Sequence, residues 1–467
     1  MLHDSLRRAT ENFGDRDALR FGDDALTFAE LDAQSDEYAA SLSARGAQVG
    51  DRIALQMSNR PEFVVIINAI SKLGAATVLL SPAWKSLEID HALGLTTPRL
   101  VITDDEVRAL DGAQAGGPDE AILVFSSGTT GLPKAVRHTH ASLGVATAHW
   151  VAALGLTADD RFQVATPPSH ILGLLNLLAA AEAGVTVRLH PRFDLDEVLS
   201  RIESDRLTLE MAVAPIALAM ANHPDLERFD LSSLRYIMWG ATPVTESVAE
   251  TVTARSGVGF MPAYGASEFP VLACNPVGDS TRWRLDSAGL PPHGVELRVV
   301  DLDTRTVLEP GGVGEIQARG ASVMAGYLPE NANADAFEDG WYRTGDVGWI
   351  EADGWVHLTD RSKEMIKVKG FQVAPAEIEA VLHGHADVLD CAVFGLPDEV
   401  AGEVPVAAVQ LLPDASVSED ELKRLVADSL ATYKQLRHLV VVDVIPRLPS
   451  GKVLRRTLRD EWAPKLT

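Results

Sequence analysis

Apolar runs alternate with helix-like stretches along the first half of the chain. Residues 51–57 have the pattern of a buried strand, and residues 61–75 are helix-like and begin at a proline. Strand patterns return at 77–82, at 99–104 and at 121–125, with a further helical stretch between the first two. Strands and helices that alternate at this spacing predict a parallel sheet with helices on both faces.

The pattern changes in the second half. Residues 234–240 and 258–265 continue the open-sheet units, in which ligands lie beyond the carboxyl ends of the strands. From about 287 to 359, short β-rich runs separated by turn signals predict a small β subdomain. After the stretch 359–364, helical and strand patterns are mixed to the end of the chain.

The predicted fold class is α/β, with two domains. The large N-terminal domain, residues 1–359, is expected to hold open, mostly parallel sheets and the β subdomain. A smaller α+β domain is expected at 360–467. A chain of 467 residues is too long for one ordinary core. The boundary is placed at 360–363, because the remaining block has the size of a small independent domain.

Composition limits the partners and the compartment. Hydrophobic residues make up 46% and charged residues 23%, which is the balance of a folded soluble protein. The net charge of −25 argues against nucleic acid or an anionic membrane as the main partner, since both select clustered Lys and Arg. The only cysteines, Cys274 and Cys391, lie far apart and have no ligand spacing, so neither a disulfide framework nor a zinc site is predicted. We expect a cytoplasmic protein, monomeric or homodimeric, with no membrane-spanning segment.

One short stretch, FSSGTTGLPKA at 125–135, combines glycines, hydroxyls and a lysine behind an apolar run. Glycine frees backbone N–H groups and hydroxyl side chains add donors, so Ser126 to Lys134 can surround phosphate oxygens. The stretch lacks the Walker pattern, because Lys134 follows a proline and no Ser or Thr follows it. The alternative is a flexible surface turn, which Gly and Ser also make.

Further motifs follow in a fixed order. They are PPSHILGL with His170, YGASE with Tyr264 and Glu268, YRTGD with Asp346, DRSKEMIKVKGFQVAPAEIEA with Arg361, Lys363, Lys367 and Gln372, and PSGKVLRR with Lys452. Together with SSGTTGLPK, they resemble the adenylate-forming superfamily of acyl-CoA synthetases, luciferases and peptide-synthetase adenylation domains. The resemblance extends over nearly the whole chain, and KVKGFQVAPAEIEA is most similar to coumarate CoA ligases and luciferases.

The resemblance implies a reaction in two steps. A carboxylate joins the α-phosphorus of ATP and pyrophosphate leaves, and the acyl group then passes from AMP to the thiol of CoA. A carboxylate is already ionised at neutral pH, so the first step needs charge neutralisation and alignment and no general base. The implied cofactors are ATP, Mg²⁺ and CoA, and the implied partner is a small carboxylic acid.

The resemblance also assigns roles around the nucleotide. Glu268 is expected to bind Mg²⁺, Ser267 to donate to the α-phosphate, and Tyr264 to offer a flat face to adenine. Asp346 suits the ribose hydroxyls, with Arg361 nearby. A core aromatic and a turn residue are the alternatives for Tyr264 and Asp346. The remaining expected nucleotide-site residues are Ser126, Ser127, Gly128, Thr129, Thr130, Gly131, Lys134, Gly240, Ala241, Gly265 and Gln372.

The acyl pocket departs from the family pattern. In the family, the histidine that matches His170 gates this pocket, although a packed core histidine is the alternative. Trp239 occupies a place usually held by a small residue, and Phe269 is bulky, so we expect a reshaped pocket. The expected lining is His170, Trp239, Gly240, Gly265, Phe269 and Val271. The acid is expected to be aromatic, cyclic or of medium length, with no specific compound assigned.

Two lysines are expected to act in different steps. Lys452 lies in another domain from the phosphate loop, so the domains must close to bring them together. Its expected role is to stabilise charge during carboxylate attack, and a surface lysine is the alternative. The family precedent has a mobile C-terminal lid that turns about the residue matching Lys363 and then presents Lys367 and Gln372.

Two other functions stay open from the sequence. A stand-alone adenylation enzyme could load the phosphopantetheine arm of a carrier protein or hand its acyl-adenylate to a partner. A non-catalytic nucleotide-binding protein is the third possibility, although Lys134, Glu268 and Lys452 are all present.

Overall fold

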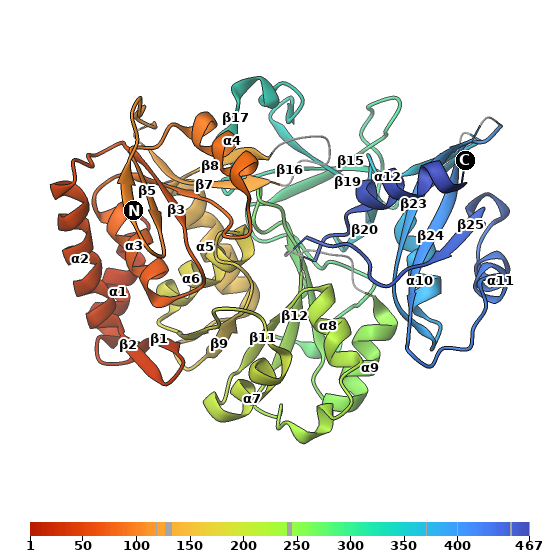
Figure 1. Cartoon of the computed structure of the whole chain (residues 1–467), viewed down its shortest axis with the longest axis horizontal. Coiled ribbons are helices and arrows are strands. Elements are labelled where there is room, and N and C mark those ends of the chain that lie inside the picture. The colour runs from red at the N-terminus through yellow and green to blue at the C-terminus, as the bar shows by residue number, and fades with distance from the viewer. Residues whose placement is uncertain are drawn as a thin grey trace.

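The computed structural model describes residues 1–117, 119–126, 133–240, 245–369, 371–398, 400–448 and 451–466. A large N-terminal part carries several sheets with helices packed around them, and a smaller C-terminal part lies at the opposite end of the molecule (Figure 1). No helix in these described ranges combines the length and apolar character needed to cross a membrane.

The first sheet has seven strands in the order β17-β8-β7-β4-β3-β5-β6. The central strands β7, β4, β3 and β5 are parallel, and the outer pairs are antiparallel, which confirms the predicted parallel core. The strands are β3 (Arg52–Gln56), β4 (Ala76–Leu79), β5 (Leu100–Thr103), β6 (Val107–Ala109), β7 (Glu120–Ser126), β8 (Lys134–Thr139) and β17 (Gly326–Leu328). The helices in the same part of the chain are α1 (His3–Phe13), α2 (Phe28–Ala44), α3 (Pro61–Lys72), α4 (Ser86–Thr96) and α5 (His140–Leu154).

Two further sheets have four strands each. One has the order β2 (Asp24–Thr27), β1 (Asp17–Phe21), β10 (Thr186–Leu189) and β9 (Arg161–Val164). The other has the order β11 (Leu209–Ala212), β12 (Tyr236–Trp239), β13 (Phe260–Tyr264) and β14 (Ala273–Cys274). Their helices are α6 (Ile171–Ala183), α7 (Leu195–Asp205), α8 (Ala214–Ala221) and α9 (Glu246–Ser256). The carboxyl ends of β12 and β13 lead into the site.

A five-stranded antiparallel sheet follows. Its strands are β15 (Glu296–Val300), β16 (Gly314–Arg319), β18 (Phe337–Glu338), β19 (Trp341–Ile350) and β20 (Val356–Arg361). The sheet lies in the stretch that the sequence predicted to be β-rich, and β20 continues past residue 359 to Arg361. The last strand therefore runs directly into the expected boundary at 360–363.

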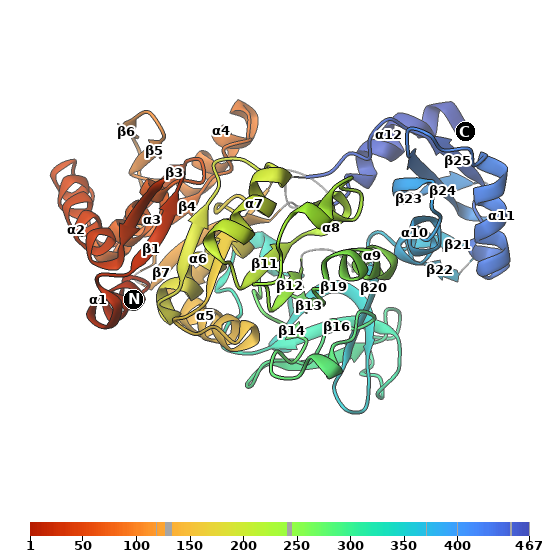
Figure 2. The same ribbon diagram turned by 90° about the horizontal axis from the view of Figure 1, so that it is seen from below.

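The C-terminal part has its own sheet and its own core. Its strands are β21 (Ile366–Val368), β22 (Phe371–Val373), β23 (Val388–Asp398), β24 (Gly402–Leu411) and β25 (His438–Val441), and its helices are α10 (Pro375–His383), α11 (Glu419–Ser429) and α12 (Arg455–Leu466). Two hydrophobic clusters contain only residues from Ile366 onward. Seen from below, this part meets the rest mainly beside α8, α9 and β20 (Figure 2).

Local sequence signals explain where many of these helices begin and end. Capping boxes start α2 at Thr27 and α11 at Ser418, where each hydroxyl accepts a backbone N–H and a glutamate bonds back. Proline occupies the first turn of α3 and of α10, where no N–H is needed. Gly184 ends α6 in the left-handed conformation.

Candidate active site

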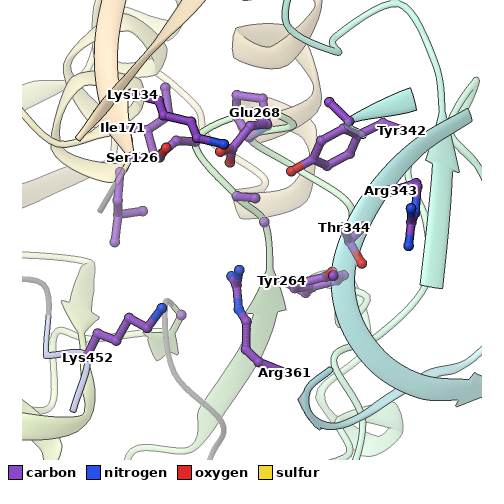
Figure 3. Close-up of a pocket in the computed structure, with 18 of the residues that line it drawn as sticks. Ser126, Lys134, Ile171, Tyr264, Glu268, Tyr342, Arg343, Thr344, Arg361 and Lys452 are labelled. Carbon is purple, nitrogen blue, oxygen red and sulfur yellow. The ribbon is translucent and has the colours of Figure 1, made fainter. Parts of the chain in front are cut away.

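A cavity of about 560 Å³ lies where the N-terminal sheets meet the C-terminal part. Side chains from β7, β8, α6, β13, β19, β20 and the segment before α12 all reach it. In Figure 3, Ser126, Lys134 and Glu268 lie on one side of this space, and Lys452 and Arg361 point into it from the other.

The side of the cavity predicted to bind phosphate, called the phosphate side below, is built on the antiparallel pair β7–β8. Ser126 ends β7 and Lys134 begins β8, and the two residues are paired in register. The Lys134 Nζ lies 5.2 Å from the centre of the Tyr327 ring, and the Tyr327 hydroxyl donates to Glu268 Oε1 at 2.7 Å. Lys134 and Glu268 are therefore brought together through one tyrosine. The predicted loop residues Ser127, Gly128, Thr129, Thr130 and Gly131, and also Ala241, lie outside the described residues.

A tight turn after β13 carries Ser267 and Glu268. A side chain on Gly265 would place its Cβ 2.0 Å from the Pro270 carbonyl oxygen, so glycine is required there. The Ala266 and Phe269 backbones bond to each other across the turn. Gly240 and Gly265 both line the cavity.

His138 on β8 is a residue that the sequence analysis missed. It is fully buried, and burial lowers its pKa to about 4, so its ring is neutral at physiological pH. Its Nε2 lies 2.8 Å from the Ser267 carbonyl oxygen, which can only accept, so Nε2 carries the proton and donates. His138 thus fixes the backbone between Ser267 and Glu268. Only the fold reveals this, because 129 residues separate the two partners.

Tyr264 and Arg361 both contact Asp346, the residue predicted to accept the ribose hydroxyls. The Tyr264 hydroxyl donates to Asp346 Oδ2 at 2.6 Å, and Arg361 Nε lies 2.7 Å from Asp346 Oδ1. Burial and the Asp346 charge raise the pKa of Tyr264 well above its ordinary value. Tyr264 and Arg361 line the cavity, whereas Asp346 is not among the described lining residues and stands behind them. Each oxygen of Asp346 has one partner here, and a carboxylate oxygen can accept a second hydrogen bond.

One wall of the cavity is apolar. It consists of Trp150, Ile171, Leu172, Leu175, Met238 and Ala263, and we call it the apolar wall. His170 stands beside it at the N-terminus of α6, and burial lowers the pKa of His170.

Three expected pocket residues do not belong to the lining. Trp239, Phe269 and Val271 are buried elsewhere, with exposed fractions of 1%, 0% and 0%. The Trp239 ring packs against Phe260 at a centroid distance of 5.5 Å, in the core beneath α8 and α9. Successive strand side chains point to opposite faces, so Met238 takes the cavity face of β12 and Trp239 the other. The tryptophan at the cavity is Trp150, which the motifs do not mark.

The C-terminal lysines are placed differently. Lys452 lines the cavity, and burial is the largest of the effects that lower the pKa of its ammonium. Lys363 also lines it. Lys367 and Gln372 are exposed, paired opposite each other on β21 and β22, and do not line it. In this arrangement Lys452, and not Lys367, faces the phosphate side.

The described residues contain no group of three or more His, Cys, Asp or Glu side chains placed to hold a metal ion. A lone carboxylate suits Mg²⁺, which keeps several waters and is usually bound through one or two carboxylates together with substrate phosphates. Glu268 fits that role, because its Oε1 is fixed by Tyr327 and it lies beside Lys134.

Comparisons with known proteins agree with this geometry. The model of the AMP-binding enzyme family matches residues 6–120 and 111–328, and the model of the AMP-binding enzyme C-terminal domain matches residues 377–452. The 4-coumarate–CoA ligase 5 of Oryza sativa subsp. japonica is 35% identical over 509 aligned positions, which cover 99% of this chain and 94% of the relative.

Solved structures match along almost the whole chain. ATP-bound MatB from Rhodopseudomonas palustris has a TM-score of 0.90 at 26% identity, with both chains fully covered. The o-succinylbenzoate CoA synthetase MenE from Bacillus subtilis, in complex with its acyl-adenylate intermediate, has a TM-score of 0.86 at 30% identity over 98% of each chain. The chain therefore belongs to the AMP-binding enzyme family, the adenylate-forming superfamily, in its acyl-CoA synthetase branch.

Proposed function

We propose that this enzyme activates an apolar monocarboxylic acid with ATP and transfers the acyl group to the thiol of CoA. The observation that carries the proposal is the meeting of Lys452, from the C-terminal part, with Ser126, Lys134 and Glu268 in one cavity. AMP-forming acyl-CoA ligases of this family use ATP, Mg²⁺ and CoA.

In the first step the protein supplies positive charge and alignment. Lys134 and the hydroxyl of Ser126 are placed for the β- and γ-phosphates as pyrophosphate leaves. Lys452 and Arg361 approach from the opposite side, where charge develops on the carboxylate and the α-phosphate. Glu268 would hold Mg²⁺, which when bound neutralises phosphate charge.

The apolar wall supports an acid without a second charge. Its six described residues carry no ionised group, and His170 beside it is neutral because burial lowers its pKa. A second carboxylate placed there would lose its hydration without gaining a partner. Trp150 and Met238 offer a flat face and an adaptable thioether, which suit an aromatic, cyclic or medium-length acyl chain.

For the second step we propose that the part from Ile366 onward turns about Lys363. Such a turn would withdraw Lys452 and bring Lys367 and Gln372 from β21 and β22 toward the adenylate. CoA is the proposed acceptor, because the relatives and several structural neighbours are named as CoA ligases or CoA synthetases. The two buried free thiols, Cys274 and Cys391, suit the reducing cytoplasm, where we place the enzyme.

A pyrophosphate-exchange screen tests the proposal directly. Apolar aromatic, cyclic and medium-length monocarboxylic acids should support ATP–pyrophosphate exchange, and dicarboxylic acids of similar size should not. Mass spectrometry should then detect the acyl-CoA when CoA is added. A preference for dicarboxylic acids would contradict the assignment of the apolar wall. Acyl transfer to a carrier-protein arm but not to CoA would contradict the acceptor.

A further inference from the structure

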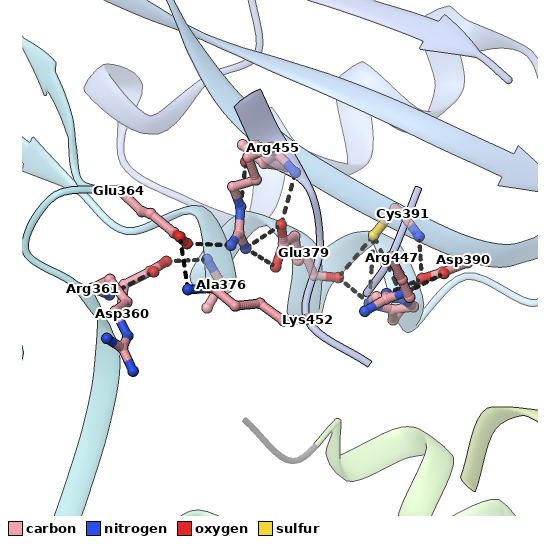
Figure 4. Close-up of polar contacts among 12 residues, drawn as sticks. Asp360, Arg361, Glu364, Ala376, Glu379, Asp390, Cys391, Arg447, Lys452 and Arg455 are labelled. Atoms are coloured by element: carbon pink, nitrogen blue, oxygen red, sulfur yellow. Dashed lines mark hydrogen bonds and ion pairs between the residues drawn. The ribbon is translucent and has the colours of Figure 1, made fainter. Parts of the chain in front are cut away.

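Glu364 faces Lys452 from the residue that follows Lys363. The Lys452 Nζ lies 3.8 Å from Glu364 Oε1. The other oxygen, Oε2, accepts a hydrogen bond from Arg455 at 2.5 Å. The Glu364 side chain is only 13% exposed, so water screens these contacts weakly. Figure 4 shows Glu364 between the lysine and the arginine, with one oxygen directed at each.

All three guanidinium nitrogens of Arg455 donate hydrogen bonds, which fixes the position of the Glu364 carboxylate. The Arg455 Nε donates to the Val393 carbonyl on β23 at 2.9 Å, and one terminal nitrogen donates to both oxygens of Glu379 at 2.7 and 2.9 Å. Glu379 on α10 also accepts the Val393 N–H at 2.7 Å. The Arg455 guanidinium is therefore fixed between β23 and α10, and its remaining terminal nitrogen donates to Glu364.

Lys452 needs a counter-charge in this position. Burial is the largest of the effects that lower the pKa of Lys452, and the positive charges of Arg361 on β20 and Arg455 on α12 lower it further. The carboxylates of Glu364 and of Asp346 on β19 attract the ammonium and act in the opposite direction. Asp346 is already engaged by Tyr264 and Arg361. Glu364 is thus the carboxylate best placed to offset the positive charges.

We propose that Glu364, held in place by Arg455, is the positioning residue and counter-ion that keeps the Lys452 ammonium charged and directed into the cavity during adenylate formation. The inference rests on the proposed function of Lys452 in that step. Glu364, Arg455 and Lys452 all follow Lys363 in the chain, so a turn at Lys363 would move the three together.

The deciding variant is Glu364→Gln, which keeps the shape and an acceptor for Arg455 but removes the charge. As pH rises, the exchange activity of this variant should fall at a pH about one unit lower than in wild type, because the Lys452 ammonium loses its proton more readily. At about pH 9 the turnover should fall about tenfold, with KM for ATP within about twofold. Transfer from a supplied acyl-adenylate to CoA should not change.

Three further variants test whether the shift is caused by the charge of Glu364 and by its contact with Arg455. Glu364→Asp keeps the charge and should retain the wild-type profile. Arg455→Lys keeps a positive charge but loses the guanidinium, and should shift the profile in the same direction as Glu364→Gln. Glu461→Gln is the matched control, since it removes a carboxylate that pairs with Lys465 at 3.0 Å on the exposed end of α12, and it should behave as wild type.

Lys452→Ala, measured in parallel, separates the inference from the function beneath it. If Lys452→Ala retains exchange, the proposed role of Lys452 fails. If Lys452→Ala loses exchange but Glu364→Gln keeps the wild-type pH profile, the role of Glu364 is overturned and the function stands. Thermal unfolding shows which variants are folded. Should Glu364→Gln not fold, a wild-type profile in Arg455→Lys overturns the inference.

Discussion

Hydrogen bonds to the side chain and to the backbone hold Glu268 in position. The Tyr327 hydroxyl binds one of its oxygens, and the Met324 N–H binds its backbone carbonyl at 2.8 Å. His138 holds the preceding carbonyl, that of Ser267. The position of the carboxylate at the cavity is therefore fixed by contacts to its side chain and to its backbone. A fixed carboxylate binds a charged ligand more strongly than a mobile one, because no free energy is spent on ordering it during binding.

Glu268→Gln should lose most Mg²⁺-dependent pyrophosphate exchange, by about 10²-fold, while folding normally. The amide keeps the bond to Tyr327 but cannot neutralise a divalent cation. Exchange measured across a Mg²⁺ titration checks this, with thermal unfolding as the fold control. Activity within about threefold of wild type would remove Glu268 from the metal site.

Replacing each of two buried tryptophans by alanine should affect the choice of acid differently. Trp150→Ala enlarges the apolar wall, so bulkier acids should rise in the exchange ranking. Trp239→Ala removes a ring packed on Phe260, so it should cost about 3–5 kcal/mol of unfolding free energy and leave the ranking unchanged. Exchange over a panel of acids and denaturant unfolding measure the two effects. A changed ranking in Trp239→Ala alone would contradict the placement of both residues.

Motifs predicted which polar residues meet in the cavity, because Lys134, Glu268 and Lys452 are marked by their sequence context. They could not predict which face of β12 turns inward, since Met238 and Trp239 are both large and apolar and the strand is buried on both sides. They also could not show that Asp346 is already engaged by Tyr264, because that contact depends on how β13 meets β19.

At the scale of elements, backbone and side-chain hydrogen bonds hold the residues on either side of 449–450 in place before α12, and Lys452 is one of them. Leu448 N–H bonds the Lys452 carbonyl at 2.8 Å, and Arg447 donates to the Gly451 carbonyl at 2.8 Å while it also pairs with Asp390. Gly451 has a φ of +85° and is buried. A Cβ there would lie 2.8 Å from Cδ of Pro215, at the start of α8. Gly451 therefore lies close against the N-terminal part at the start of α8.

Gly451→Ala should weaken this contact and lower exchange by about tenfold or more, because the new methyl group both strains the left-handed backbone and pushes against Pro215. Acyl transfer from a supplied adenylate should be spared. Gly311→Ala is the matched control, since Gly311 also has a φ of +85° but a Cβ there would meet open space, with nothing within 4 Å beyond its chain neighbours. Equal losses in both variants would show that backbone strain alone is responsible.

A buried polar chain joins two sheets away from the cavity. Gln163 on β9 donates to Glu210 on β11 at 2.6 Å, and His190 bonds the Gln163 side-chain oxygen at 2.7 Å. Burial raises the pKa of Glu210 from 4.5 to about 8 and lowers the pKa of His190 to about 4. Both groups are therefore neutral near pH 7, which lets the chain sit in the core without a counter-ion.

Glu210 should make the protein less stable as pH rises. Its folded-state pKa lies above its unfolded value, so the stability it contributes is complete below about pH 4.5 and is lost as pH approaches 8. Glu210→Gln should lack this loss, and its melting temperature should gain on wild type between about pH 5 and about pH 8.5. Differential scanning fluorimetry across that range checks it. A constant difference at all pH values would mean that Glu210 titrates normally.

At the scale of the whole molecule, Lys452 and Lys367, the lysines expected to act in different steps, are placed differently in the C-terminal part. Lys452 reaches the cavity, while Lys367 is exposed on β21. The Lys367 backbone N–H bonds Glu403 at 2.8 Å, which ties that hairpin to the C-terminal sheet. The described structure thus corresponds to the arrangement proposed for the first step.

Measuring adenylate formation and acyl transfer separately should show that different variants lose different steps. Lys452→Ala should lower adenylate formation by about 10²-fold or more and still transfer acyl from a supplied adenylate, and Lys367→Ala should do the reverse. Lys363→Pro should spare the first step and stop the second, because proline fixes φ where the backbone must turn. Equal loss of both steps in all three variants would contradict the alternation.

The hydrogen bond between Asp360 and α10 crosses the proposed turning point. Asp360 lies on the N-terminal side of Lys363, and its carboxylate accepts the Ala376 N–H at 3.0 Å, at the positive end of the helix. Under the proposed turn, every catalytic cycle must break this bond and remake it. The strength of this bond would then contribute to the free-energy difference between the two arrangements. It would thereby contribute to the time for which the reactive mixed anhydride stays enclosed before CoA is admitted.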